Sequence, residues 1–165
     1  METLERTILE ITHDGLDASV DVIRRAFGTV ADEMCLTPEN CPRYPAFTTI
    51  DKLEEMRENG GVFFGLFADG LQAGFVAVEK EQDNQYYLKR LAVLPEYRHT
   101  GFGRELVDFI IDYVKNRGIS KLCIAMVNEQ TVLKDWYKGM GFRETSIREF
   151  EQLPFTVCFM EMDIK

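Results

Sequence analysis

The pattern of apolar and polar positions predicts one strand and two helices in the first part of the chain. Residues 6–12 alternate and are rich in β-branched side chains, which is typical of a strand. Residues at helical spacing predict an amphipathic helix, with a glycine as its stop: Leu16, Val20, Ile23, Phe27 and then Gly28. A proline-containing irregular stretch over 35–47 leads to a second helix over 50–59, which Thr48 or Thr49 is placed to cap.

Three apolar runs joined by tight turns follow. They span residues 62–68, 71–81 and 86–94. Asp69-Gly70 is a strong two-residue hairpin signal, and Asp83-Asn84 marks a second turn. Such short connections join antiparallel neighbours, so we expect a three-stranded antiparallel unit.

The rest of the chain alternates between helices and strands. The patterns predict a helix over 103–116, a strand over 121–127, a helix over 131–140 and strands over 142–150 and 157–164. The face of the first of these helices that we expect to be buried is formed by Leu106, Phe109, Ile110, Tyr113 and Val114. The predicted fold class is α/β (α+β), in the order β-α-α-β-β-β-α-β-α-β-β, with helices packed on a mixed sheet in a single domain over 1–165.

Composition and charge narrow the function classes. Of the 165 residues, 45% are hydrophobic and 28% are charged, as in ordinary globular proteins. The formal net charge of −9 disfavours nucleic acid as a partner and suits a cationic substrate, although such acidity often serves only solubility. No apolar run is long enough to cross a bilayer, and the polar start, Met1 to Arg6, has no signal-peptide core. We therefore expect a cytoplasmic protein without a membrane partner.

The cysteines and histidines give no metal or redox signature. Cys35, Cys41, Cys123 and Cys158 include no pair at C-x-x-C spacing. Cys123 and Cys158 lie in apolar runs, which predicts buried thiols, whereas Cys35 and Cys41 flank a loop. His13 and His99 are the only histidines. We therefore predict no metal site.

A turn with two glycines joins the strand that ends at Leu94 to the helix that follows. A helix start presents unpaired N–H groups and the positive end of the helix dipole, and Gly101 and Gly103 let an anion approach the main chain closely. Arg98 and Arg104 add positive charge. The turn is neither a P-loop nor a dinucleotide-binding G-x-G-x-x-G. As a local pattern it indicates a phosphate-bearing ligand.

The run from Leu91 to Gly103 resembles the acetyl-CoA signature R/Q-x-x-G-x-G/A of the GNAT N-acetyltransferase family, and the element order also fits that family. The resemblance implies a mostly antiparallel sheet in which a bulge splays a central parallel strand pair, 88–94 and 121–127. It also implies that acetyl-CoA is the cosubstrate. The implied pyrophosphate-binding residues are Arg98, His99, Thr100, Gly101, Phe102, Gly103 and Arg104, and the implied pantetheine-pairing strand is Leu91, Ala92 and Val93.

A second segment resembles the N…Y-x-x-x-G-F pattern of the same family. It comprises Asn128 and the run from Trp136 to Phe142. The resemblance implies that Tyr137 protonates the departing thiolate of CoA and that Asn128 binds the pantetheine. A phenol with a pKa near 10 is a suitable donor to a thiolate whose conjugate acid has a pKa of about 8.5. Read alone, the two residues would be a core tyrosine and a helix-capping asparagine.

The proton acceptor is not evident. Many family members carry a glutamate on the strand before the signature, but residues 86–90 contain no carboxylate. Glu79 and Glu81 on the preceding strand are substitutes, and solvated edge charges are the favoured interpretation for both. The backbone N–H of Leu91 or Val93 would polarise the thioester carbonyl.

The acceptor site is implied to lie between the loop over 35–47 and the hairpin over 149–156. Candidate aromatic wall residues are Tyr44, Phe47, Phe150 and Phe155, and candidate cation-attracting residues are Asp32, Glu33, Glu39, Glu149 and Glu151. Local packing explains each of them equally well. The acceptor amine, the acyl chain and the oligomeric state, including a homodimer, stay open.

The leading hypothesis is an acetyl-CoA-dependent N-acetyltransferase that acts on a primary amine of a small molecule or a peptide, by direct attack. The alternative is a non-catalytic module that binds acyl-CoA. The missing carboxylate in residues 86–90 motivates that alternative.

Overall fold

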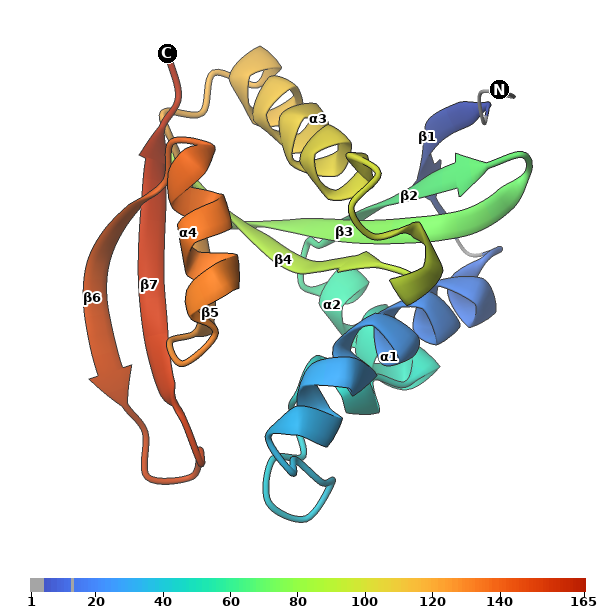
Figure 1. The fold of residues 1–165 in the computed structure, drawn as a ribbon. Helices are drawn as coiled ribbons and strands as arrows, with labels where there is room; N and C mark the ends of the chain where they lie inside the picture. The colour runs from blue at the N-terminus through green and yellow to red at the C-terminus, as the bar shows by residue number, and fades with distance from the viewer. Residues whose placement is uncertain (1–4, 13) are drawn as a thin grey trace.

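The computed structural model describes residues 5–12 and 14–165, and this part of the chain folds around one sheet (Figure 1). Its strands are β1 (Arg6–Ile11), β2 (Val62–Ala68), β3 (Leu71–Gln82), β4 (Gln85–Val93), β5 (Lys121–Val127), β6 (Arg143–Glu149) and β7 (Thr156–Asp163). Its helices are α1 (Leu16–Glu33), α2 (Ile50–Glu58), α3 (Phe102–Asn116) and α4 (Thr131–Gly139), with the short 3₁₀ turns η1 (Pro45–Phe47) and η2 (Pro95–Tyr97). The order matches the one predicted from the sequence.

The sheet has seven strands in the order β1-β2-β3-β4-β5-β7-β6, and its neighbours are antiparallel except for β4 and β5. The fold class predicted from the sequence is therefore confirmed. Helix α3 covers one face of the sheet, and α1 and α2 cover the other (Figure 1). Strand β5 is buried mainly on the α3 side, because Leu122, Ile124 and Met126 belong to the core that α3 covers whereas Ala125 is exposed.

The parallel pair is splayed, as the family resemblance implies. Strands β4 and β5 pair over only three positions, which end with Tyr87 opposite Cys123, although β4 continues to Val93 and β5 to Val127. A bulge accompanies the separation, because Ala77 lies opposite Lys89 whereas Phe75 lies opposite Ala92. Arg90, inside that interval, has a φ of +53°, a left-handed conformation that bends the strand. Beyond the bulge β4 runs away from β5 (Figure 1).

Helix α3 anchors the larger core. Its buried residues are Phe102, Leu106, Val107, Ile110 and Val114, and they lie against buried residues of β2, β3 and β5. Phe109 and Tyr113, which the sequence also placed on the inner face, are half-buried and pack edge-on against Phe64 at centroid distances of 4.9 and 5.2 Å. Each fully buried large apolar side chain contributes about 1.5–3 kcal/mol to stability. This packing fixes the start of α3 relative to the end of β4.

The local turn and cap predictions are largely correct. The Thr49 side chain accepts a hydrogen bond from the Lys52 amide and caps α2. Asp69 and Gly70 both have positive φ, of 49° and 85°, as a type I′ hairpin turn requires.

The predicted end of the first helix is wrong. Helix α1 continues through Gly28 to Glu33, and the chain leaves helical geometry at Cys35, where φ is +55°. Gly28 is tolerated because the helix gains apolar contacts beyond it, where Ala31 is buried and Val30 packs against the same cluster. That packing exceeds the roughly 1 kcal/mol cost of a glycine inside a helix.

A smaller apolar cluster joins the 35–47 loop to the chain between β6 and β7. Its buried members are Ala31, Leu36, Cys41, Tyr44 and Ala46, and Val127, Leu153 and Phe155 pack against them. The ring of Tyr44 lies edge-on to Phe155, with centroids 6.3 Å apart. The two segments therefore touch each other on the α1 side of the sheet.

Candidate functional site

The turn between β4 and α3 is built to expose amide groups. After η2, His99 has a φ of +63° and Gly101 a φ of +89°, so the chain reverses twice in left-handed geometry before α3 begins. The first intrahelical bond runs from the Glu105 amide to the Gly101 carbonyl, at 3.0 Å. The N–H groups of Phe102, Gly103 and Arg104 precede that bond and have no acceptor within the helix. Together with the helix dipole they form an anion-binding start.

Arg98 fastens this turn to α1 rather than lining it. Its Nη2 donates to the Ala26 carbonyl at 2.6 Å, and its Nη1 donates to the Thr29 hydroxyl at 3.2 Å. Its amide donates to the Pro95 carbonyl at 3.3 Å. Both terminal nitrogens of the Arg98 guanidinium and its backbone amide therefore donate within the protein. Arg98 thus holds the backbone of the turn in place.

Three polar side chains of the turn face water, whereas Phe102 is buried in the core. His99, Thr100 and Arg104 are exposed. The Thr100 hydroxyl donates to the Tyr97 carbonyl, which closes the turn on itself. The Arg104 Nε lies 3.9 Å from an Asp108 carboxylate oxygen, too weak a pairing in water to remove the cation. Arg104 is thus the charged side chain of the turn that remains accessible to an anion.

The strand segment Leu91 to Val93 has one free edge. On one side Ala92 and Val93 pair with Phe75 and Gly74 of β3. On the other side β5 has already diverged, because its pairing with β4 ends at Tyr87. The edge next to the amide-rich turn is therefore open to an extended ligand, which β-augmentation would bind through main-chain hydrogen bonds.

Tyr137 points into the core from α4. Its side chain is 6% exposed and packs against Phe142 at a centroid distance of 5.6 Å. Burial raises the pKa of the phenol above its usual value. Tyr137 is not among the fully enclosed side chains of the described residues whose polar atoms lack a hydrogen-bond partner. A phenol with a raised pKa stays protonated at neutral pH and is a weaker acid than a solvent-exposed tyrosine.

Asn128 lies at the end of β5, where several polar contacts fasten the chain. Its amide donates to the Thr156 carbonyl at 2.9 Å, and its side-chain oxygen accepts from Lys134 Nζ. The Glu129 carboxylate accepts from both the amide and the hydroxyl of Thr156, each at 2.6 Å. Lys134 thus binds the side-chain oxygen of Asn128. The side-chain NH₂ group of Asn128 is left for a ligand.

The two substitute carboxylates differ in their surroundings. Glu79 is only 15% exposed in its side chain, and one of its carboxylate oxygens lies 2.6 Å from Lys89 Nζ. It also lies near the half-buried Arg90 of the bulge; burial lowers the pKa of Arg90, and the Glu79 charge raises it. Glu81 is exposed. Solvated edge charge therefore describes Glu81 and is wrong for Glu79.

The predicted acceptor walls are brought together only in part. Tyr44, Phe47 and Phe155 form one aromatic cluster with Phe27, with Tyr44 at its centre. Tyr44 is buried, and burial followed by the nearby Cys41 and Glu33 raises the pKa of its phenol. Phe150 is half-buried outside this cluster. The acidic candidates are exposed: Asp32, Glu33, Glu39, Glu149 and Glu151. The aromatic residues thus bring the 35–47 loop and the 149–156 hairpin into contact with each other.

Two residues near the site had no role in the sequence interpretation. Arg90 forms the bulge in a left-handed conformation. A non-glycine residue seldom adopts this conformation, so no local sequence pattern predicts it. Trp136 of α4 lies against the start of α3: a Cβ on Gly103 would be 3.4 Å from its ring. Its place one residue before Tyr137 was the available signal.

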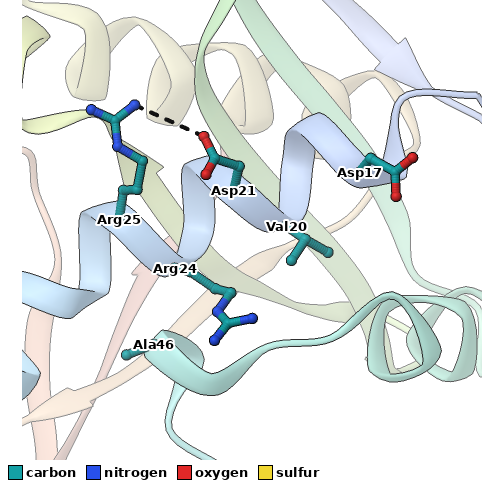
Figure 2. A pocket seen from close by; sticks show the side chains of 6 residues that line it. All are labelled: Asp17, Val20, Asp21, Arg24, Arg25 and Ala46. Carbon is teal, nitrogen blue, oxygen red and sulfur yellow. Dashed lines mark ion pairs between the residues drawn. The ribbon is translucent and has the colours of Figure 1, made fainter.

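Other features of the described residues lie apart from this site. A surface hollow of about 460 Å³ lies along the outer side of α1, and its lining residues are Asp17, Val20, Asp21, Arg24, Arg25 and Ala46 (Figure 2). In residues 5–12 and 14–165, no group of three or more metal-ligating side chains is gathered; His13 lies outside these residues. None of the helices in that part of the chain has the length and apolar character needed to cross a membrane.

The cysteines are free thiols. Cys41, Cys123 and Cys158 are buried, and burial raises the pKa of each; Cys35 is exposed. The prediction of buried thiols at Cys123 and Cys158 is confirmed.

Comparison with known proteins identifies relatives of this arrangement. The model of the acetyltransferase (GNAT) family matches residues 27–142. The probable N-acetyltransferase camello of Xenopus tropicalis is 28% identical over 123 residues, which cover 70% of this chain and 56% of that protein. The ribosomal protein bS18-alanine N-acetyltransferase of Escherichia coli (strain K12) is 31% identical over 85 residues, covering 52% of this chain and 57% of that enzyme. The chain thus matches little more than half the length of these curated relatives.

A solved structure shares the fold along the whole chain. It is the PaiA N-acetyltransferase of Thermoplasma acidophilum in complex with coenzyme A, with a TM-score of 0.79 and 21% identity, covering 96% of this chain and 99% of that one. At this identity the likeness speaks for the fold alone.

Proposed function

The chain belongs to the acetyltransferase (GNAT) family, and on that premise we propose that it transfers the acetyl group of acetyl-CoA to a primary amine of a small molecule or a peptide. The observation that carries the proposal is the free edge of Leu91–Val93, directly before a helix start with unpaired amides. A ligand that joins a pyrophosphate to an extended amide-containing arm fits both features, and CoA is such a ligand. That a relative bears the name of a bS18-alanine N-acetyltransferase supports an amine acceptor.

The binding roles follow from the exposed groups. The backbone N–H groups from His99 to Arg104 would hold the pyrophosphate, with the Arg104 side chain as an accessible cation. The free edge of Leu91, Ala92 and Val93 would pair with the pantetheine. The NH₂ group of Asn128, which Lys134 orients through the side-chain oxygen, would add one contact to the arm.

The chemistry that we propose is direct attack. The amine adds to the thioester carbon, the carbonyl oxygen is stabilised by a backbone N–H of Leu91 or Val93, and the C–S bond breaks. Tyr137 would donate its proton to the departing thiolate. Burial keeps the pKa of its phenol raised, so it carries that proton throughout the neutral range. The attacking amine must lose a proton as well. Because Glu79 is paired with Lys89, we propose that water accepts this proton.

The test is release of CoA thiol from acetyl-CoA in the presence of a panel of primary amines and short peptides. We expect turnover with at least one acceptor. Tyr137→Phe should lower kcat by about 10- to 100-fold, since general acid catalysis is worth about 10²–10⁴ and water replaces part of it. CoA affinity, measured by calorimetry, should change little. Absence of turnover across the panel would refute the proposal.

A non-catalytic acyl-CoA-binding module is the second candidate. One observation favours it. The carboxylate of Glu79, which is largely shielded from water near the bulge, is paired with Lys89. The module predicts acetyl-CoA binding without thiol release under any of the conditions above. It also predicts that Tyr137→Phe has no effect on any measured property of the acetyl-CoA complex.

A further inference from the structure

Trp136 lies across the space between the amide-rich turn and the free strand edge. A Cβ built on Gly103 would lie 3.4 Å from both Cη2 and Cζ2 of the indole, and 3.8 Å from Cγ2 of Val93. Gly103 lies in the first turn of α3 and Val93 ends the free edge. The outer edge of the Trp136 ring therefore reaches the point where the two parts of the proposed cofactor site meet.

Core packing does not account for this position. Trp136 is 36% exposed, whereas its neighbour Tyr137 is 6% exposed and belongs to the main core. Leu133, one turn earlier on the same face of α4, is 38% exposed. An indole with about a third of its surface in water is an incompletely buried apolar surface, which a ligand beside it would cover.

The covalent structure of CoA determines which of its parts would lie against Trp136. In CoA the pantoic acid unit follows the pyrophosphate directly, and it carries two methyl groups on a quaternary carbon. An arm that leaves the amides of the turn and pairs with Val93 passes Gly103 with this apolar unit. The nucleotide leaves the pyrophosphate in the other direction.

We propose that Trp136 is a cofactor-contacting residue that covers the pantoic acid part of the pantetheine arm. This inference rests on the proposed function. It assigns the indole to the arm rather than to the nucleotide.

The single tryptophan makes the inference measurable, because all tryptophan emission comes from Trp136. Acrylamide quenching is measured in the free protein, with saturating CoA, and with saturating 3′-phospho-ADP, the nucleotide part without the arm. We expect CoA to reduce the quenching constant about twofold or more, because the arm covers the exposed third of the ring. 3′-Phospho-ADP should leave quenching unchanged. Equal protection by both ligands, or protection by neither, would overturn the inference.

Substitutions provide an independent test. Trp136→Ala should weaken CoA binding by roughly tenfold and leave 3′-phospho-ADP binding within about twofold, both by calorimetry. Trp136→Phe, which keeps an apolar ring, should fall between. Val132→Ala is the matched control, since Val132 is 83% exposed on the same helix and should change neither affinity. Equal weakening of both ligands would mean that Trp136 only supports the fold.

The outcomes separate the two proposals. If CoA binds and thiol release proceeds while Trp136 is insensitive to the arm, the inference fails and the proposed function stands. If calorimetry detects no CoA binding to the wild-type protein, the proposed function fails and the inference with it.

Discussion

The guanidinium of Arg98 donates a 2.6 Å hydrogen bond to the backbone carbonyl of Ala26, and so ties the amide-rich turn to the middle of α1. The two residues are 72 positions apart in the chain. The cation that the signature motif supplies thus acts inside the protein, between the turn and a helix on the opposite face of the sheet from α3. The exposed Arg104 is the cation of the turn that faces water.

Separate roles for these two arginines give the first prediction. Arg98→Ala removes a charge-assisted hydrogen bond and should lower the free energy of unfolding by about 1–3 kcal/mol, as well as weaken CoA binding through disorder of the turn. Arg104→Ala should weaken CoA binding without a measurable stability loss. Urea unfolding and calorimetry measure the two quantities. Equal stability of both variants would contradict the assignment.

The elements were predictable where the signal is local. The bounds of β2 and β5 were given to the residue, because glycine and polar turn residues bracket continuous apolar runs. The amide-rich turn was also recognisable, since Gly101 and Gly103 stand where a strand becomes a helix. The sequence places the end of α1 at Gly28 too early, because the apolar contacts around Ala31 that extend the helix come from the irregular 35–47 loop and from the chain between β6 and β7.

The parts of the site that escaped prediction depend on tertiary contacts. The hydrogen bonds of Arg98 to α1 and the contact of Trp136 with Gly103 each join elements that no local periodicity connects. Glu79 and Glu81 differ because Glu79 lies beside Lys89 and Arg90, whereas Glu81 lies at the strand end, where the pairing of β3 with β4 is irregular. A sequence pattern does not show where along a strand neighbouring side chains enclose a carboxylate.

The second prediction concerns Glu79, which we expect to stabilise the bulge rather than to accept the proton of the amine. Glu79→Gln should lower the free energy of unfolding by about 1 kcal/mol, because the negative charge beside Lys89 and the half-buried Arg90 is lost. The acidic limb of the pH profile of kcat/KM should keep its midpoint. Glu81→Gln, at an exposed position of the same strand, is the control. A limb that disappears in Glu79→Gln alone would make Glu79 the general base.

The third prediction follows from the buried phenols. Burial raises the pKa of Tyr137 and of Tyr44 above the ordinary value of about 10. A group whose pKa is raised on folding favours the folded state while it is neutral, so this stability is complete below about pH 10 and is lost as the pH rises above it. Each phenol should contribute up to about 1.4 kcal/mol per pH unit in that range.

Urea unfolding between pH 8 and pH 11.5 (about the practical range of the method) measures this loss. The double variant Tyr44→Phe, Tyr137→Phe should lose less stability than the wild-type protein over the same interval, because lysine titration is common to both. Parallel curves for the two proteins would show that the phenols ionise freely in the folded state.

The final prediction concerns the contact between the 35–47 loop and the chain that joins β6 to β7. Tyr44 and Phe155 lie 6.3 Å apart, and Val127 at the end of β5 packs against the same cluster, so the contact lies where β4 and β5 are already separated. This contact lies on the side of the sheet opposite α3 and α4, and we expect the acceptor amine to pass between its two segments. Phe155→Ala should lower the free energy of unfolding by about 1–3 kcal/mol, less than for a fully buried ring, because Phe155 is half-buried. It should also raise kcat/KM for peptide amines relative to small amines, since the 35–47 loop would no longer contact the chain between β6 and β7. Leu71→Ala, at a 69% exposed position of β3 near the β2–β3 turn, should leave that ratio unchanged. An unchanged ratio in a folded Phe155→Ala protein would show that acceptors do not pass between these walls.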